Sequence, residues 1–289
     1  MDLYSIHFEW WEKLMEFKIP KRIIQTGKSI DLPLLSKAAV ANARLLNPDF
    51  EYLFFDNNQV EKFFDEKAPE YRSVFNSFRF PIQRYDFFRY LAIYHLGGFY
   101  FDLDVFLADC LEDLLDAGCV FPFEELTLNK FLRQEYGMDW EIGNYAFGAV
   151  AGHPFIHAII KNCVKAQNDS DWVHKMMKPI PRVFQKDFYV FNTTGPGLIS
   201  RTLAEYPEAS KQVKVLFPED VCDSTKWHHF GNFGVHLMEG TWLKRKSVLW
   251  RIVTREWMAW TSNKLYKESM MSGGSRSLEF KKIKGDDLQ

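Results

Sequence analysis

The first hundred residues alternate between strand-like and helix-like hydrophobic patterns. Short apolar runs at 22–25 and 50–55 end in a glycine or in an Asp-Asn cluster, which is typical of buried strands closed by turns. Apolar positions at helical spacing over 34–46 predict a helix that ends at Asn47-Pro48, and 59–78 predicts a second, mixed helical region. The order is therefore strand, helix, strand, helix.

A third strand follows a helix that the sequence delimits at both ends. Pro81 suits a first helical turn, the helical pattern runs to Leu96, and Gly97-Gly98 is typical of a helix end. The aromatic segment 99–106 then predicts a strand. This alternation predicts an α/β fold with a mostly parallel sheet flanked by helices.

Composition excludes some classes of protein. The chain has 289 residues and a formal net charge of −2, so it lacks the basic field of a nucleic-acid-binding protein and we expect no such partner. It contains no run of about 18 apolar residues, and it does not begin with a basic segment followed by an apolar core. We therefore expect no membrane span, no signal peptide and a cytoplasmic location. Apolar residues at helical spacing within 1–21 predict a docked amphipathic helix.

Two aspartates near the end of the third predicted strand are the first candidates for chemistry. Successive strand residues point to opposite faces, so Asp102 and Asp104 are expected to share one face. Two carboxylates on one face suit a hard divalent cation, which can bridge a diphosphate. An isolated pair of this kind is more often an acidic strand end that faces water.

The preceding helix adds weight to the functional interpretation. Asp86 and Arg89 are three residues apart, so they lie on one helical face and can pair. Because the helix around them is rich in Phe, Tyr and Leu, we expect the pair to be buried, and buried charges are rarely incidental. Arg89 is a candidate to hold phosphate or sugar hydroxyls, and Asp86 to orient it or to accept hydrogen bonds from a sugar. The alternative is a surface ion pair, which contributes little.

The order of helix, double glycine, aromatic strand and acidic pair over 84–91 and 97–104 resembles a known family. It is similar to the DXD-containing sugar transferases typified by the yeast initiating mannosyltransferase, which include bacterial capsular and surface-polysaccharide transferases and, distantly, the clostridial glucosylating toxins. Further segments resemble the family from about residue 19 to 242. They are 19–26, 47–52, Asn144, 152–154, 194–196, 235–236 and 240–242.

The resemblance implies a fold, a metal and an activity. The fold would be GT-A, with a Rossmann-like, mostly parallel sheet that binds a nucleotide sugar. Asp102, Asp104 and His236 would hold Mn²⁺ or Mg²⁺, although a single histidine is more often structural, and His228 and His229 are nearby competitors. The implied catalytic residues are Asp86, Arg89 and Asp104. The implied donor-binding residues are Gln25, Thr26, Asp86, Arg89, Asp102, Asn144, Thr194 and Gly195.

The resemblance implies a retaining glycosyltransferase that moves a sugar from a UDP- or GDP-linked donor to a saccharide or lipid-linked saccharide, as in polysaccharide biosynthesis. Two alternatives remain: a toxin-like protein glycosyltransferase, and a nucleotide-sugar-binding protein that has lost turnover. The chain departs from its relatives at Ile24 and Gly27, where they usually carry histidine and an aromatic residue. Gln25 and Thr26 are therefore expected to contact the nucleotide through backbone groups. Asn144 has the simpler alternative of capping a turn.

The C-terminal region lies beyond this catalytic segment. We predict a catalytic domain over 1–242, a basic, tryptophan-rich helical extension over 243–271 and a disordered tail over 272–289. The segment 243–260 contains five basic residues and one acidic residue, Glu256, and its tryptophans recur at helical spacing. Such a helix suits an anionic membrane surface, contacted through 243–267 at the inner face of the membrane. The alternative is a helix whose tryptophans pack on the core.

Overall fold

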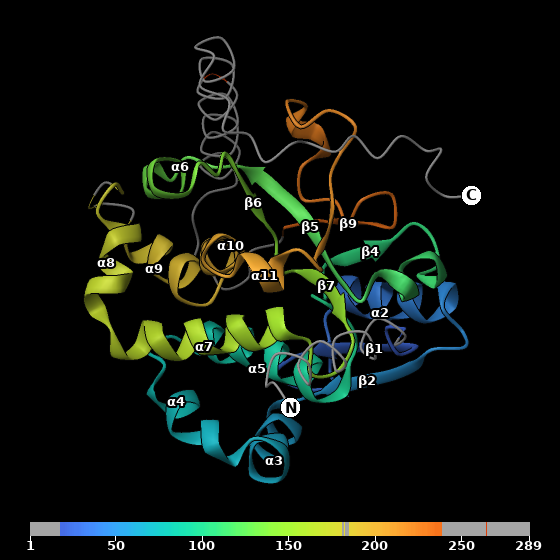
Figure 1. The fold of residues 1–289 in the computed structure, drawn as a ribbon. Coiled ribbons are helices and arrows are strands. Elements are labelled where there is room, and N and C mark those ends of the chain that lie inside the picture. The colour runs from blue at the N-terminus through green and yellow to red at the C-terminus, as the bar shows by residue number, and fades with distance from the viewer. Residues whose placement is uncertain (1–17, 181, 183–184, 239–263, 265–289) are drawn as a thin grey trace, which may run out of the picture.

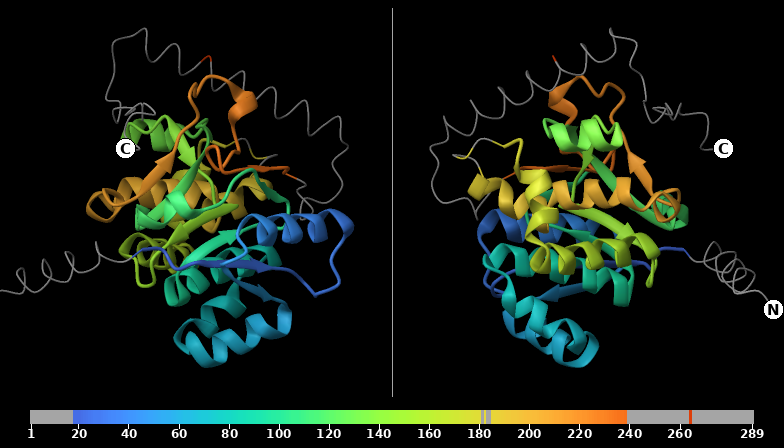
Figure 2. Two further views of the ribbon diagram at one scale, coloured as in Figure 1. Left: turned by 90° about the vertical axis from the view of Figure 1, so that its right-hand side faces the viewer. Right: turned by 60° about the vertical axis from the view of Figure 1, so that its left-hand side comes forward.

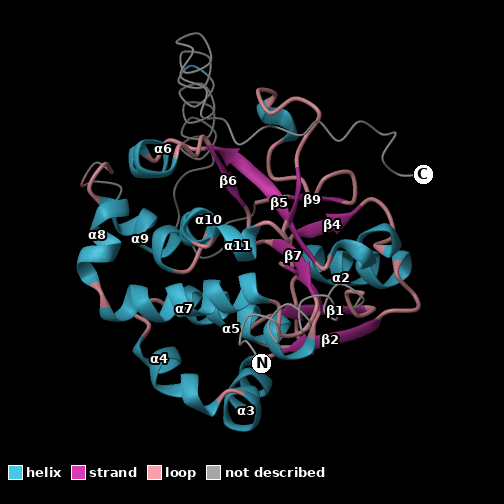
Figure 3. Ribbon diagram, in the orientation of Figure 1, coloured by secondary structure: helices cyan, strands magenta, loops and turns pink. Residues whose placement is uncertain are grey.

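A mixed β-sheet forms the centre of the molecule, and helices cover both of its faces (Figures 1 and 3). The computed structural model describes residues 18–180, 182, 185–238 and 264. The predicted N-terminal helix and the predicted extension and tail after 242 lie outside these residues, except for Lys264. The α/β class expected from the sequence, with a sheet flanked by helices, is confirmed.

The seven-stranded sheet has the order β2-β1-β3-β7-β5-β6, and β8 pairs with β5. The strands are β1 (Arg22–Thr26), β2 (Glu51–Phe55), β3 (Gly98–Phe101), β5 (Cys119–Leu126), β6 (Trp140–Ile142), β7 (Ala146–Ala149) and β8 (Lys214–Leu216). The pairs β1–β2, β1–β3 and β5–β8 are parallel, as expected for strands joined through helices. The pairs β3–β7, β5–β7 and β5–β6 are antiparallel, so the sheet is mixed, and the strands predicted from the first hundred residues, β1, β2 and β3, pair in parallel.

Alternation along the strands builds two hydrophobic cores, one on each face. Tyr100 belongs to the larger core, which packs against α5 (Pro81–Leu96), α7 (Pro154–Asn168) and α10 (Pro196–Glu205). Phe99 and Phe101 belong to the smaller core, which includes Ala43 of α2 (Leu34–Leu46). The central strand β3 is therefore covered on both sides, which explains why its segment reads as a continuous apolar run.

The remaining helices surround this framework. Figure 2 shows α3 (Asn57–Lys67) and α4 (Arg72–Ser77) at the lower end of the molecule. The others are α6 (Lys130–Tyr136), α8 (Ser170–Met177), α9 (Gln185–Thr193), α11 (Pro207–Ser210) and the 3₁₀ turns η1 (Pro69–Tyr71), η2 (Glu112–Ala117) and η3 (Ser224–Lys226). The mixed helical region predicted over 59–78 is thus two helices and a turn, because Pro69 lacks the N–H that a continuous helix needs.

Helix α5 has the bounds that its sequence predicts, and they place the site. Pro81 occupies the first turn, and Gly97 ends the helix with φ at +64°. Gly98 also has a positive φ, of 108°, and a Cβ there would lie 2.7 Å from the carbonyl oxygen of Arg22. Two glycines are therefore required for the chain to turn directly from α5 into the centre of the sheet.

One predicted strand is wrong in its length. The segment 99–106 divides into β3, which ends at Phe101, and β4 (Val105–Leu107). Asp102 and Asp104 lie in the turn between them, where the Val105 amide donates to the Asp102 carbonyl at 3.1 Å. Strand alternation therefore does not orient the two aspartates. The division arises because β4 leaves the main sheet to pair with β9 (Gly234–His236), a partner about 130 residues away that local sequence does not reveal.

Candidate functional site

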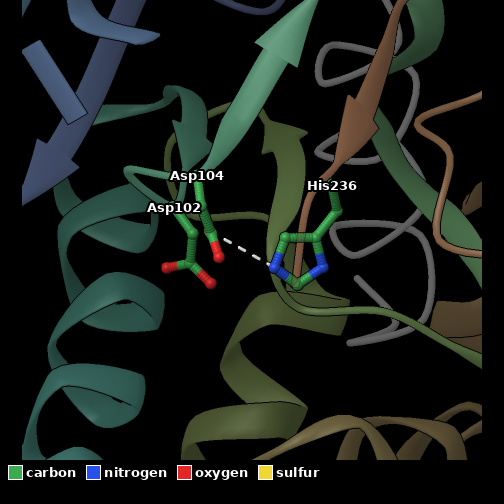
Figure 4. A group of neighbouring side chains, drawn as sticks. All are labelled: Asp102, Asp104 and His236. Atoms are coloured by element: carbon green, nitrogen blue, oxygen red, sulfur yellow. Dashed lines mark ion pairs between the residues drawn. The ribbon is translucent and has the colours of Figure 1, made fainter. Parts of the chain in front are cut away.

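Asp102, Asp104 and His236 converge on one point of the molecule. The Asp102 amide donates to the carbonyl of Tyr145 at 2.7 Å, which anchors the turn to the strand beside it. Antiparallel pairing of β4 with β9 sets Val105 opposite His236 and so brings the imidazole next to the turn. One ligand atom from each of the three residues lies within 4.8 Å of the others (Figure 4). Sequence reasoning named these three residues, and the structure brings them together.

The histidine of this group is paired with a carboxylate. His236 Nε2 lies 3.3 Å from Asp104 Oδ1, and the two side chains are 16% and 19% exposed. Burial disfavours the charged imidazole, but the adjacent carboxylates of Asp104 and Asp102 outweigh it and raise the pKa of His236 above its usual value. The ring also stacks on Tyr145, with ring centroids 4.3 Å apart. These contacts hold the imidazole toward the carboxylates.

Arg89 is the centre of a buried charge network behind the turn. Its Nη2 lies 3.1 Å from an oxygen of Asp86 and 3.1 Å from an oxygen of Asp102. Its Nη1 donates to the other Asp102 oxygen at 3.2 Å and to the backbone carbonyl of Asn144 at 2.7 Å. The residue is 3% exposed, which confirms the predicted buried pair with Asp86. Arg89 therefore fixes the Asp102 carboxylate in two-point contact, and a direct contact with the donor stays a prediction.

Asp86 is almost fully buried, whereas the side chain of Asp102 is 27% exposed. Burial raises the pKa of Asp86 to about 6, against the opposing effects of Arg89 and of the Thr194 hydroxyl. Burial also raises the pKa of Asp102, again opposed by Arg89. Tyr100 donates its hydroxyl hydrogen to Asp102 at 2.9 Å, and the Arg89 guanidinium lies 4.6 Å from the centre of the Tyr100 ring. Removing the arginine would leave the buried carboxylate of Asp86 and the partly exposed carboxylate of Asp102 without the cation they share.

Asn144 and Thr194 complete this network from two other elements. Asn144, in the connection between β6 and β7, donates to Asp86 at 3.3 Å and to the Tyr90 hydroxyl at 2.9 Å. Thr194, between α9 and α10, donates its hydroxyl hydrogen to the other Asp86 oxygen at 2.8 Å. Gly195 is buried next to it and precedes α10. The structure thus joins Asn144 and Thr194 to Asp86, while their predicted donor contacts remain predictions.

Gln25 and Thr26 end β1 beside the turn. Gln25 is fully buried, donates to the Asp102 carbonyl at 3.4 Å and accepts from the Tyr52 hydroxyl at 2.9 Å. The Thr26 hydroxyl donates to the Phe55 carbonyl at 2.8 Å. Both side chains have internal partners, and the predicted backbone contacts of Gln25 and Thr26 with a nucleotide stay a prediction.

Two residues of the site were missed from the sequence. Tyr100 and Tyr145 were not singled out, although each stands close in sequence to a predicted site residue. Tyr100 precedes Asp102 by two positions, and Tyr145 directly follows Asn144. Aromatic residues are so frequent in this chain that their position alone carried no signal.

Comparison with known proteins confirms the resemblance described above. Residues 33–121 match the family described as glycosyltransferase sugar-binding region containing DXD motif. This segment includes Asp86, Arg89, Asp102 and Asp104, whereas His236 lies outside it.

Individual relatives match over longer stretches. The chain is 33% identical over 144 residues to mannosyl phosphorylinositol ceramide synthase SUR1 of Saccharomyces cerevisiae, covering 50% of this chain and 34% of that protein. It is 28% identical over 193 residues to inositol phosphoceramide mannosyltransferase 1 of Schizosaccharomyces pombe, covering 65% of this chain and 52% of that protein. Among solved structures, the PaToxG glycosyltransferase aligns with a TM-score of 0.41 at 14% identity, over 71% of this chain and 78% of that one. The chain thus spans between about a third and a half of the length of these two curated relatives.

Proposed function

Because this chain carries the DXD-containing sugar-binding region of glycosyltransferases, we propose that it is a metal-dependent, retaining glycosyltransferase. It moves a sugar from a nucleotide-diphosphate donor to a saccharide or lipid-linked saccharide acceptor. The observation that carries the proposal is the convergence of Asp102, Asp104 and His236 from distant parts of the chain. The family match over residues 33–121 includes the two aspartates but not His236.

The three side chains fit a divalent cation. Carboxylate oxygens suit Mg²⁺ and Mn²⁺, and an imidazole in the set favours Mn²⁺ as the softer ion. Their ligand atoms lie close enough to share one ion, and the side chains are partly exposed, so a substrate can reach them. A cation held here would neutralise the charge that develops on the leaving diphosphate.

The protein's own residues supply position and charge. Arg89 and Tyr100 hold the Asp102 carboxylate in one orientation, and Asp86 holds Arg89. A preorganised site avoids the cost of reorganising its polar groups during the reaction. Asp86 is 4% exposed and engaged by Arg89, Asn144 and Thr194, so it serves this network and not as an attacking nucleophile.

The transfer then follows a same-face route. The acceptor oxygen forms a bond to the anomeric carbon while the bond from that carbon to the phosphate oxygen breaks. The electron pair of the broken bond leaves with the diphosphate, and the hydroxyl proton moves to the phosphate oxygen. Attack and departure on one face retain the anomeric configuration without a covalent enzyme intermediate.

The names of the relatives suggest a substrate class. Both relatives reported above are named for mannose transfer to inositol-containing ceramide lipids. For this chain we therefore propose a mannosyl donor, expected to be GDP-linked, and an acceptor with a hydroxylated head group. A UDP-linked donor, a protein acceptor and a binding protein without turnover remain the competing functions.

A lipid-linked acceptor would place the protein at a membrane surface, on its cytoplasmic side. Within the part of the chain that the structure describes, no helix is both long and apolar enough to cross a bilayer. Contact would instead come from the basic, tryptophan-rich segment 243–267, which, apart from Lys264, lies outside the described residues. Flotation with anionic vesicles tests this. Intact protein should float, and a variant with Lys244, Arg245, Lys246 and Arg251 changed to glutamine should not. Failure of the intact protein to float at low salt would rule the surface out.

The function is tested with a panel of nucleotide sugars. We expect manganese-dependent hydrolysis of one donor and a manganese-dependent rise in melting temperature with the same donor, because ligand binding to the folded state stabilises it. GDP-mannose, UDP-glucose, UDP-galactose and UDP-N-acetylglucosamine form the panel, and GDP-mannose is expected to respond most. Stabilisation without hydrolysis or transfer would favour the binding protein, and no response to any donor would reject both.

A further inference from the structure

A second polar group lies beside His236. It consists of Glu124, on β5, and His228, in the segment before β9. His228 Nδ1 lies 3.4 Å from Glu124 Oε1, and its backbone amide donates to the Glu124 carbonyl at 3.3 Å. The His228 carbonyl in turn accepts from the His236 amide at 3.0 Å. One short stretch of backbone therefore fixes this pair next to the candidate metal site.

The pair keeps hydrogen-bonding capacity that the described chain does not use. Glu124 and His228 are each 8% exposed. Glu124 Oε2 and the Tyr145 hydroxyl oxygen are buried and make no hydrogen bond to the described residues. Leaving such groups unsatisfied costs stability, so a buried cluster of them indicates a place where another molecule supplies the partner.

Three irregularities of the backbone create this arrangement. The register of β5 against β6 shifts between Phe123 and Glu125, which places Glu124 at a bulge. His228 has φ at +60°, a conformation that a residue with a side chain rarely adopts. At Gly143 a Cβ would lie 2.3 Å from Glu124 Oε2 and 2.5 Å from the Tyr145 ring. The glycine therefore lets the carboxylate and the tyrosine approach the same bend.

The chemistry of the pair selects a class of ligand. The described residues give Glu124 no lysine or arginine partner, and the nearest strand carries another buried carboxylate, Glu141. Anions such as the donor diphosphate are thus repelled. Among the described residues, only Asp102, Asp104 and His236 meet the spacing of a three-ligand metal site. Neutral hydroxyl groups remain, and they donate hydrogen bonds to a carboxylate.

We propose that Glu124, fixed by His228, binds hydroxyl groups of a polyhydroxylated acceptor, such as a sugar or a cyclitol head group. This inference rests on the proposed glycosyltransferase function and adds an acceptor subsite to it. Tyr145 connects the subsite to the metal site, because its ring stacks on His236 and lies against the same bend as Glu124. Glu124 accepts a hydrogen bond from the acceptor and takes no proton in the transfer.

The test separates acceptor binding from donor chemistry. Saturation-transfer NMR with methyl α-mannopyranoside and with myo-inositol measures binding to the full chain, and manganese-dependent donor hydrolysis measures donor chemistry. Glu124→Gln keeps the shape of the side chain but replaces one acceptor oxygen by a donor. We expect its affinity for the better probe to fall about tenfold or more, since charge-assisted hydrogen bonds are the strong ones, with hydrolysis within about twofold of wild type.

Glu141→Gln is the matched control. Glu141 is also a buried carboxylate whose Oε2 makes no hydrogen bond to the described residues, but its Oε1 accepts from the Thr127 hydroxyl and does not face His228, so the variant should leave both measurements unchanged. The proposal is overturned if neither probe binds the wild type, if Glu124→Gln binds as well as wild type, if Glu141→Gln loses as much affinity, or if Glu124→Gln loses donor hydrolysis. Absence of hydrolysis in the wild type, with polyol binding intact, would instead reject the proposed function.

Discussion

Arg89→Lys tests the buried charge network with little change of charge. The arginine makes contacts from two terminal nitrogens to Asp86, to both oxygens of Asp102 and to the Asn144 carbonyl. A lysine ammonium is a single point and cannot reach all of these groups at once. At least two charge-assisted hydrogen bonds are lost, each contributing on the order of 1.5 kcal/mol or more.

The expected loss of unfolding free energy is about 3 kcal/mol. For a domain of this size each kcal/mol lowers the melting temperature by roughly 2 to 4 °C, so the melting temperature should fall by roughly 6 to 12 °C. Urea unfolding with an unchanged slope gives the free energy directly. Donor hydrolysis should fall as well, because Asp102 loses its two-point contact with the guanidinium.

Arg72→Lys is the control for this prediction. Arg72 also bridges two carboxylates, Glu61 and Asp65, but those partners are 56% and 72% exposed. Exposed pairs contribute about 0 to 1 kcal/mol, so this variant should lose less than about 1 kcal/mol. Equal and small losses at Arg89 and Arg72 would show that the network at Arg89 does not stabilise the fold.

Four further predictions concern the site and its surroundings. Asp104→Ala should abolish manganese-dependent turnover with little change in melting temperature, and wild-type activity in this variant would reject the metal assignment. His236→Ala should weaken manganese binding but retain part of the activity, since two carboxylates remain. Manganese affinity, measured by calorimetry from pH 8 down to 5.5, should fall as pH drops through the raised pKa of His236, because the proton competes with the metal; a flat profile would exclude the imidazole as a ligand. Gly143→Ala should lose about 1 to 3 kcal/mol through overlap with Glu124 and Tyr145, and an unchanged melting temperature would contradict the close approach.

The helix before the acidic pair was predictable because its signals are local. Proline at the first turn, glycine after the last and an acid three residues before a base depend only on neighbours in sequence. The structure agrees with these signals at Pro81, Gly97 and the Asp86–Arg89 pair. Burial of that pair was also predictable, from the aromatic residues around it.

The turn at Asp102 was not predictable in the same way. No glycine or proline interrupts the segment 99–106, so local pattern favoured one continuous strand. The turn is instead fixed by the Tyr145 carbonyl and by pairing of β4 with β9, both distant in sequence. The same holds for Glu124 and His228, whose proximity depends on a bulge and on a left-handed residue. Contacts of this kind arise from tertiary structure, which local residue propensities do not predict.

The most direct test of the metal-dependent function is a crystal structure of the intact chain with Mn²⁺ and a nucleoside diphosphate, with anomalous scattering recorded at the manganese edge. We predict one strong anomalous peak within bonding distance of Asp104 and His236, close to Asp102, with a diphosphate oxygen on the same ion. A peak elsewhere in the molecule, or a bound nucleotide with no peak between these three residues, would contradict the account.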